Sequence, residues 1–294
     1  DLLEDPEVEA IAVATPDFAH RDPILLAARY GKSVLVEKPL ATTADDLEAI
    51  EQAVKSSSIR VMVDFHNRWT PPIVLARESI ERGDIGEVVS AYYRLSDTLY
   101  VPTQMLAWAG NSSPLWFLGP HIVDTLCWLI GDQVARVYAV SRSKVLVRRG
   151  IDCPDIYQAV LEFRGGAVAS IESSWILPNS HPNINDHKVS VIGTSGMLAL
   201  DLSNNSTIVK FTDQKVENPD FLVMPVIHGE PVGFAYQSIK HYVDCLVDDR
   251  PFLATFEDGV RVSRILLAIA KSAEIGKPVD LDSPSGGGND KGRQ

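Results

Sequence analysis

The chain has 294 residues, of which 45% are hydrophobic and 22% are charged, so it can bury one large core or two ordinary ones. Its formal net charge of -12 at pH 7 disfavours binding to the phosphate backbone of nucleic acids and to anionic lipid. We therefore expect neither a nucleic-acid nor a membrane partner. The longest apolar runs are much shorter than the ~20 residues of a bilayer span. Three widely spaced cysteines allow neither a disulfide framework nor a CxxC metal site, which favours a cytoplasmic location.

Residues 8–70 alternate between two periodicities, which predicts a βαβαβ unit. A first helix at about residues 20–30 is expected to end at Gly31, and a second helix to begin after Thr43 as its N-cap. Short strands that are nearly continuous in Val, Ile and Ala are typical of a parallel sheet covered on both faces. The predicted strands are VEAIAVAT (8–15), SVLVEK (33–38) and IRVMVDF (59–65).

Polar residues stand where these strands end. Right-handed crossovers bring the carboxyl ends of the three strands to one edge of the sheet, where doubly wound sheets bind ligands. Thr15, Glu37 and Lys38 fall at this edge, and Pro39 stops the second strand. The alternative for Lys38 is a solvated loop residue paired with an exposed acid.

From about residue 83 the pattern changes to strands with period-two alternation. The segment GDIGEVVSAYYRLSD (83–97) predicts a turn leading into a strand, and a helix follows at about 121–130, ending at Gly131. Such alternation predicts a mostly antiparallel sheet that leaves one face for solvent or a partner subunit. Helices at about 234–248 and 255–275 then cover or brace this sheet. The further predicted strands are 135–142, 157–163, 167–175, 188–193, 197–201 and 207–211.

Three stretches together resemble one family. They are ATPDFAH (14–20), VEKPLA (36–41) and LGPHIVDTLCWLIG (118–131). The pattern TP-x3-H, EKP and G-x-H-x2-D in this order resembles the Gfo/Idh/MocA family of nicotinamide-dependent oxidoreductases, which includes inositol and sugar dehydrogenases. The resemblance extends from about residue 8 to residue 281.

The resemblance implies a fold class of α/β plus α+β. Residues 1–72 are then the C-terminal half of a Rossmann dinucleotide-binding domain. Residues 73–281 form a substrate-binding and oligomerisation α/β domain with a large, mostly antiparallel open sheet, through which family members associate as homodimers or homotetramers. Residues 282–294 are Gly-rich and low in hydrophobic residues, which predicts a disordered tail.

The resemblance also implies NAD or NADP as cofactor. It assigns Thr15, Pro16, His20, Glu37 and Lys38 to the cofactor side of the site. Lys38 is further expected to act near the reacting hydroxyl or carbonyl group, as a cation or, if burial lowers its pKa, as a base. His20 has the alternative of being an ordinary first-turn residue of its helix.

On the substrate side the resemblance implies His121 as acid/base or orienting group and Asp124 as a contact for substrate hydroxyls. Hydride transfer from a carbinol requires its hydroxyl proton to leave, and His is suited to accept a proton near neutral pH. Spacing of three residues puts both side chains on one helix face. Asp124 has the alternative of complementing a helix dipole. The candidates for the pocket wall are Arg68, Tyr100, Trp116, Glu172 and Trp175, with packing as the alternative for Trp116.

Two features depart from the family pattern. Many members carry an Asp two residues before the Gly of G-x-H, where this chain has Phe117. The chain also has no G-x-G-x2-G turn, whose elements would occupy roughly 60 residues upstream. Either this segment has been lost, in which case this chain alone can be inactive, or its absence is natural, as in a non-catalytic relative. The segment HPNINDH (181–187) has zinc-like spacing but no clear third ligand, so no metal site is predicted.

The predicted function is therefore NAD(P)-dependent hydride transfer to or from a sugar, polyol or related substrate. A variant within the enzyme class is an aldose-oxoaldose oxidoreductase or a lyase that uses bound NAD transiently. The alternative outside that class is a non-catalytic sugar-binding or regulatory relative, which Phe117 slightly favours.

Overall fold

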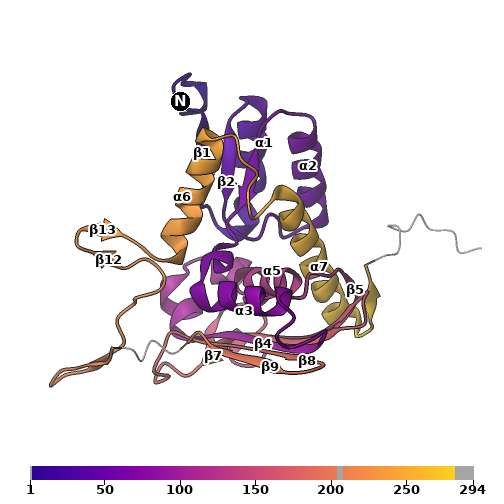
Figure 1. Cartoon of the computed structure of the whole chain (residues 1–294), viewed down its shortest axis with the longest axis vertical. Coiled ribbons are helices and arrows are strands. Elements are labelled where there is room, and N and C mark those ends of the chain that lie inside the picture. The colour runs from indigo at the N-terminus through magenta and orange to yellow at the C-terminus, as the bar shows by residue number, and fades with distance from the viewer. Residues whose placement is uncertain (1, 204–207, 282–294) are drawn as a thin grey trace, which may run out of the picture.

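Residues 2–203 and 208–281 are described by a computed structural model, in which a small parallel sheet and a wide mixed sheet are joined by helices (Figure 1). The predicted tail at 282–294 lies outside the described residues. Among the described residues, no helix is long and apolar enough to cross a membrane.

The small sheet has the order β1-β2-β3 and is parallel throughout. Val13 of β1 pairs with Val36 of β2, which pairs with Val63 of β3, so the three strands end at the same level. The observed strands are shorter than predicted, and β2 ends at Val36, although the Glu37 amide still donates to the Val13 carbonyl at 2.9 Å. Their bounds are β1 (Ala10–Val13), β2 (Ser33–Val36) and β3 (Val61–Val63).

The connections between these strands follow the predicted helix signals. Helix α1 (Arg21–Arg29) ends next to Gly31, whose φ of 68° is strained for residues with a Cβ. Helix α2 (Ala44–Lys55) starts at the N-cap Thr43, whose Oγ1 accepts the amide of Asp46 at 3.1 Å. Both predictions from the local sequence are confirmed.

The wide sheet has the order β14-β5-β6-β7-β4-β8-β9. Its central strand β4 pairs in parallel with β7 and antiparallel with β8, and the remaining pairs are antiparallel. The turn between β6 and β7 uses Gly166 at φ 97°, as the Gly-Gly signal predicted. The bounds are β4 (Val88–Thr98), β5 (Val134–Arg142), β6 (Ile156–Phe163), β7 (Val168–Leu177), β8 (Asn185–Gly193), β9 (Met197–Asp201) and β14 (Val279–Asp280).

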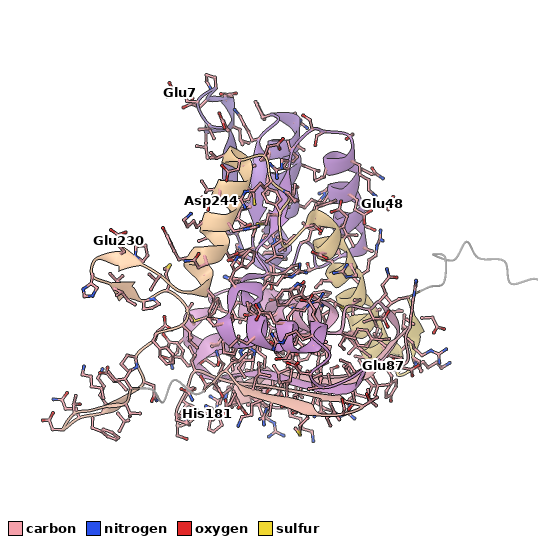
Figure 2. The ribbon with its side chains drawn as sticks, viewed as in Figure 1. Glu7, Glu48, Glu87, His181, Glu230 and Asp244 are labelled. Carbon is pink, nitrogen blue, oxygen red and sulfur yellow. The ribbon has the colours of Figure 1, made fainter. Side chains whose placement is uncertain are left out.

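One predicted strand does not join this sheet. Residues 207–211 were expected to extend it, but residue 207 lies outside the described part, and β10 (Lys210–Phe211) pairs only with β11 (Val216–Glu217). A second short ribbon, β12 (Val226–Ile227) with β13 (Glu230–Pro231), projects from the body with Glu230 near its tip (Figure 2). Period-two alternation alone did not distinguish the ribbon at Lys210 from a sheet strand, and the ribbon β12-β13 was not predicted.

Helices cover one face of the wide sheet and leave the other bare (Figure 1). The covering elements are α3 (Pro71–Glu81), α4 (Pro114–Phe117), α5 (Gly119–Ile130) and the C-terminal part of α7 (Phe256–Ile275). The bare face exposes Tyr92, Tyr138 and Val160. Short helical turns connect the elements at η1 (Leu2–Glu4), η2 (Asp17–Ala19), η3 (His66–Trp69), η4 (Val101–Met105), η5 (Ala109–Asn111) and η6 (Val147–Arg149).

The last two long helices tie the sheets together. Helix α6 (Phe234–Val247) runs beside β1, and α7 spans from β3 to β5 (Figure 1). A Cβ on Gly259 of α7 would stand 2.4 Å from Val63, so only glycine allows this helix to approach β3 so closely. At its other end, the Ser272 hydroxyl accepts the amide of Ala139 in β5 at 2.9 Å.

Candidate active site

His20 fixes the edge at which the parallel strands end. Its ring is 1% exposed, with Nδ1 2.7 Å from the Pro39 carbonyl oxygen and Nε2 3.0 Å from that of Thr15. Burial lowers the pKa of His20, so the neutral ring donates to one of the two carbonyls. The side chain thus links the segments after β1 and β2, and its ring nitrogens face backbone.

Lys38 is the buried cation at this edge. The residue is 9% exposed, and its Nζ donates to the Phe117 carbonyl at 2.9 Å and lies 4.4 Å from the centroid of the Phe117 ring. Burial lowers the pKa of Lys38, against the opposing charges of Glu37 and Asp17. The alternative of a solvated loop lysine is therefore wrong.

The open part of the same edge consists of Thr15, Pro16 and Glu37. Thr15 is exposed, and Pro16 and Glu37 are half-buried, while Lys38 lies beneath them. Polar groups at the carboxyl edge of a parallel sheet, with a cation below, suit one end of a nucleotide. These residues fit that part of a dinucleotide; the chain has no glycine-rich turn to hold a pyrophosphate.

His121 reaches the site from the first turn of α5. The helix begins at Gly119, two residues earlier than predicted, because Pro120 suits a first turn and Gly119 packs closely on α7. A Cβ at Gly119 would stand 2.8 Å from Cδ2 of Leu266. Glycine at this position thus allows close packing of α5 on α7.

The His121 ring has a buried nitrogen without a hydrogen-bond partner. This nitrogen is Nδ1, and the ring packs against that of His66, tilted by 38° with the centroids 4.8 Å apart. Burial, then the charge of Lys38, holds the pKa of His121 well below its ordinary value. Phe117, at the position where the sequence pattern led us to expect a carboxylate, contacts Lys38, Trp108 and Trp175.

Asp97 is a site residue that the sequence reasoning missed. It lies near the end of β4, is 4% exposed, and burial raises its pKa to about 7 in spite of the opposing charge of Lys38. The signal was available, since Ala91, Tyr93 and Leu95 alternate on the inward face and Asp97 continues that face. A carboxylate at an inward position of a strand is unusual enough to mark a site.

Arg68 and Asp124 bind each other. Nε of Arg68 donates to Oδ2 of Asp124 at 3.0 Å and Nη2 to Oδ1 at 2.5 Å, while Nη1 donates to Asp258 at 2.9 Å. Both members of the central pair are at most 3% exposed at the side chain. Burial lowers the pKa of Arg68, but Asp124 and Asp258 raise it above its ordinary value. The structure does not bring these two side chains to a free surface where they could meet substrate.

The predicted wall residues are dispersed. Trp116 is half-buried and packs against the core, and the neighbouring Phe117 contacts Lys38 instead. Trp175 is fully buried, with its ring 5.8 Å from that of Phe117. Tyr100 is exposed, and Glu172 pairs with an arginine on the bare face of the sheet, away from Lys38.

A cavity of about 370 Å³ with many polar lining residues lies near His121, and the ring of His66 contacts both His121 and the cavity wall. The His66 ring stands between His121 and Phe234, whose ring centroid lies 5.2 Å from that of His66, and Phe234 lines the cavity. His187 in its wall binds the Tyr93 hydroxyl at 2.7 Å. Further side chains that line it, suited to hydroxyl groups, are Asn67, Thr70, Asn183, Asn185, Asn218 and Asp220.

No group of three or more His, Cys, Asp or Glu side chains in the described ranges could hold a metal ion. The two histidines of the HPNINDH segment are engaged separately. His181 Nδ1 lies 2.8 Å from the Asn183 carbonyl oxygen, and His187 binds Tyr93.

Comparison with known proteins matches two family models. Residues 1–65 match the oxidoreductase family, NAD-binding Rossmann fold, and residues 77–281 match the oxidoreductase family, C-terminal alpha/beta domain, both of the Gfo/Idh/MocA type.

Among similar sequences, levoglucosan dehydrogenase from Pseudarthrobacter phenanthrenivorans is 26% identical and covers 95% of this chain and 82% of that protein. The NAD(+)-dependent scyllo-inositol 2-dehydrogenase from Bacillus subtilis is also 26% identical, over 96% of this chain and 80% of that protein. A crystal structure of scyllo-inositol dehydrogenase from Lactobacillus casei with bound NAD(H) and scyllo-inositol gives a TM-score of 0.77 at 17% identity, covering 96% of this chain and 83% of that one. This last likeness confirms the predicted fold.

Proposed function

The chain belongs to the Gfo/Idh/MocA family of NAD(P)-dependent oxidoreductases, and on this premise we propose that it transfers a hydride between nicotinamide and a ring carbon of a cyclic polyol or sugar. The observation that carries the proposal is the buried Lys38 ammonium at a parallel-sheet edge, beside the unpaired ring nitrogen of His121. The domain bounds that go with it are residues 1–72 and 73–281.

NAD or NADP is the proposed cofactor, held on this chain by Thr15, Pro16, Glu37 and Lys38. The bound nicotinamide supplies or accepts the hydride, and the side chains manage charge and protons. His20 contributes by fixing the two strand ends, through its contacts to Thr15 and Pro39.

Lys38 stabilises negative charge on the reacting oxygen. A cation at a site shielded from water is worth much more than in solution, because little solvent must reorganise when charge develops. The nearby carboxylates Asp17, Glu37 and Asp97 counteract the effect of burial on the Lys38 pKa and so help to keep the ammonium charged.

His121 accepts the hydroxyl proton as the carbinol is oxidised, and returns it in the reverse direction. Its low pKa keeps the ring neutral, with a nitrogen able to accept. Asp97, with a pKa of about 7, is a further group of this site, and it can exchange a proton near neutral pH. Arg68 and Asp124 hold α5, and hence His121, as positioning residues.

The amide-rich cavity beside Phe234 is the proposed seat of the remaining substrate hydroxyls. Its polar lining and volume of about 370 Å³ suit a six-membered polyol or anhydrosugar, and the related enzymes named above act on levoglucosan and scyllo-inositol. The bare face of the wide sheet, with Tyr92, Tyr138 and Val160, is the proposed contact of a homodimer or homotetramer. All three cysteines are buried thiols, consistent with the proposed cytoplasmic location.

The test is a titration of the full chain with NADH and NADPH, followed by turnover on levoglucosan, scyllo-inositol and myo-inositol. Lys38→Met is expected to lower kcat by about 10²- to 10³-fold while cofactor still binds. Lys271→Met is the matched control, because Lys271 lies on an exposed helix face and pairs with Glu274. Equal losses in both variants would refute the role of Lys38.

A second candidate is a non-catalytic sugar-binding relative. Phe117 and the unpaired Nδ1 of His121 favour it, since no carboxylate orients the ring. Saturable binding of an inositol by a protein that binds no nicotinamide cofactor would establish this second function and exclude the first.

A further inference from the structure

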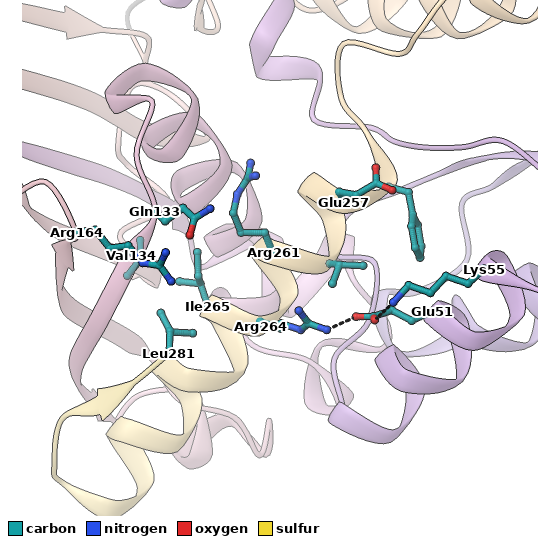
Figure 3. A pocket seen from close by; sticks show the side chains of 12 residues that line it. Glu51, Lys55, Gln133, Val134, Arg164, Glu257, Arg261, Arg264, Ile265 and Leu281 are labelled. Atoms are coloured by element: carbon teal, nitrogen blue, oxygen red, sulfur yellow. Dashed lines mark hydrogen bonds and ion pairs between the residues drawn. The ribbon is translucent and has the colours of Figure 1, made fainter. Parts of the chain in front are cut away.

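A basic cavity lies apart from the proposed active site. It has a volume of about 420 Å³, is open to solvent on one side and is bordered by α2, α7 and the start of β5 (Figure 3). Lys38, Asp97 and His121 are not among its lining residues. The polar side chains that line it are Glu51, Lys55, Gln133, Arg164, Glu257, Arg261 and Arg264.

The lining is positive although the protein is acidic. Three arginines and one lysine face two carboxylates, in a chain with a formal net charge of -12. Of the two carboxylates, Glu51 is already bound, since Arg264 approaches its Oε1 at 2.6 Å and Lys55 its Oε2 at 2.8 Å. Because one carboxylate lies between two cations, the group of Glu51, Lys55 and Arg264 has a net positive charge.

Arg261 adds a third guanidinium to the lining. Its Nη2 binds Asp258 at 2.5 Å, and Asp258 also binds Arg68, which pairs with Asp124 as well. The Nε atom of Arg261 is buried and has no hydrogen-bond partner. Because this atom is buried, Arg261 contributes positive charge to the cavity and not a direct contact through Nε.

Opposite walls carry the cations. Figure 3 shows Arg164 and Gln133 on one side, Lys55 and Glu51 on the other, and the α7 arginines between them. Guanidinium groups bind phosphate oxygens through two parallel N–H donors, and several of them around one hollow match a dianion better than a single charge. The cavity is also large enough for a phosphate group with a small organic part.

We propose that this cavity binds a small phosphate-bearing molecule, either inorganic phosphate or a phosphorylated sugar. The site involves this chain's own residues only and does not depend on the oxidoreductase activity proposed above. The two carboxylates in the lining, Glu51 and Glu257, repel a phosphate group and so lower the affinity of the cavity for it.

The experiment is calorimetric titration of the full chain, free of nucleotide, with inorganic phosphate and with glucose 6-phosphate, at constant ionic strength set by sodium chloride. Glucose is the unphosphorylated control. Saturable binding with one site is expected for at least one phosphate compound and not for glucose. Tighter binding of phosphate would identify the free ion as ligand, and tighter binding of glucose 6-phosphate would identify the sugar phosphate.

Variants locate the binding. Arg264→Gln is expected to weaken it about tenfold, because one charge-assisted contact is lost. Glu257→Gln is expected to tighten it several-fold, because a repelling carboxylate is removed. Arg82→Gln is the control, since Arg82 is exposed on α3 and pairs with Asp84.

Three results would overturn the proposal. They are absence of saturable binding to either phosphate compound, equal weakening by Arg82→Gln and Arg264→Gln, or unchanged affinity in Glu257→Gln. The last variant removes no cation and no ion pair of the cavity, so it keeps the test decisive even if Arg264→Gln fails to fold.

Discussion

Helix α5 carries members of two groups of buried charge that differ in how completely they are paired. In the first, Asp124 meets Arg68 through two hydrogen bonds, and Arg68 continues to Asp258. In the second, one turn earlier on the helix, His121 has an unpartnered nitrogen, and Lys38 is held by a backbone carbonyl and a ring. A saturated group, in which the buried charges are fully paired, stabilises the fold. An unsaturated group, in which a buried polar atom lacks a partner, retains the capacity to bind a reacting molecule.

The largest expected effect is on the saturated group. Arg68→Met should lower the free energy of unfolding by about 3–5 kcal/mol, because it leaves Asp124 buried without its cation. Denaturant unfolding followed by circular dichroism measures the loss. Adding Asp124→Leu to Arg68→Met should recover part of it, since no unpaired charge remains at the centre.

The matched control for this prediction is Arg82→Met. Arg82 has exposed partners, Asp84 and Glu78, so its loss should change stability by no more than about 0.5 kcal/mol. A small effect of Arg68→Met, comparable to this control, would contradict the division into a structural and a chemical group.

A second prediction concerns Asp97 and pH. Its pKa of about 7 in the folded chain stands above the ordinary 3.8, so the folded state holds the proton more tightly and stability falls as pH rises through this window. Asp97→Asn removes that loss. We compare the free energies of unfolding of the variant and of the unmodified chain at each pH. The difference between them should shift in favour of the variant by about 2–3 kcal/mol from pH 5 to pH 8, at roughly 1.4 kcal/mol per pH unit.

Unfolding midpoints at both pH values measure this difference. Asp22→Asn is the control, because Asp22 is exposed in the first turn of α1 and should leave the pH dependence as it is. If Asp97→Asn gave the same gain at pH 5 as at pH 8, the carboxylate would not titrate in this window.

The smallest expected effect is that of Phe117→Leu. The substitution removes the ring that lies 4.4 Å from the Lys38 ammonium and its contact with Trp175, and should cost about 1–2 kcal/mol of stability. Phe18→Leu, at an exposed position beside Trp108, should cost less. A loss as large as that of Arg68→Met would show that packing around Lys38, too, is a main support of the fold.

Much of the fold could be predicted from local signals. The Thr43 cap, Gly31 and the Gly165-Gly166 turn depend on neighbouring residues only, and each appears where the sequence indicated. The ribbon at Lys210 could not be assigned to its place, because the choice between sheet and ribbon depends on partners far away in the chain.

The candidate site was predictable in part. Lys38 and His121 carried short-range patterns, and both lie at the proposed site. Arg68 and Asp124 are 56 positions apart in sequence, and only the tertiary structure shows that they bind each other. Asp97 had a readable signal in the inward alternation of β4, but its meaning required Lys38 to be nearby.

The long brace formed by α7 has a consequence for biosynthesis. Gly259 packs on Val63 in the first sheet and Ser272 accepts the amide of Ala139 in the second, so α7 leaves the ribosome after both of the strands that it connects. Until α7 has been synthesised, the nascent chain exposes the apolar surfaces of both sheets that α7 later covers. We therefore expect chaperones to bind this nascent chain. Premature termination before Thr255 would leave both surfaces open for good, which makes such fragments candidates for degradation and not for partial activity.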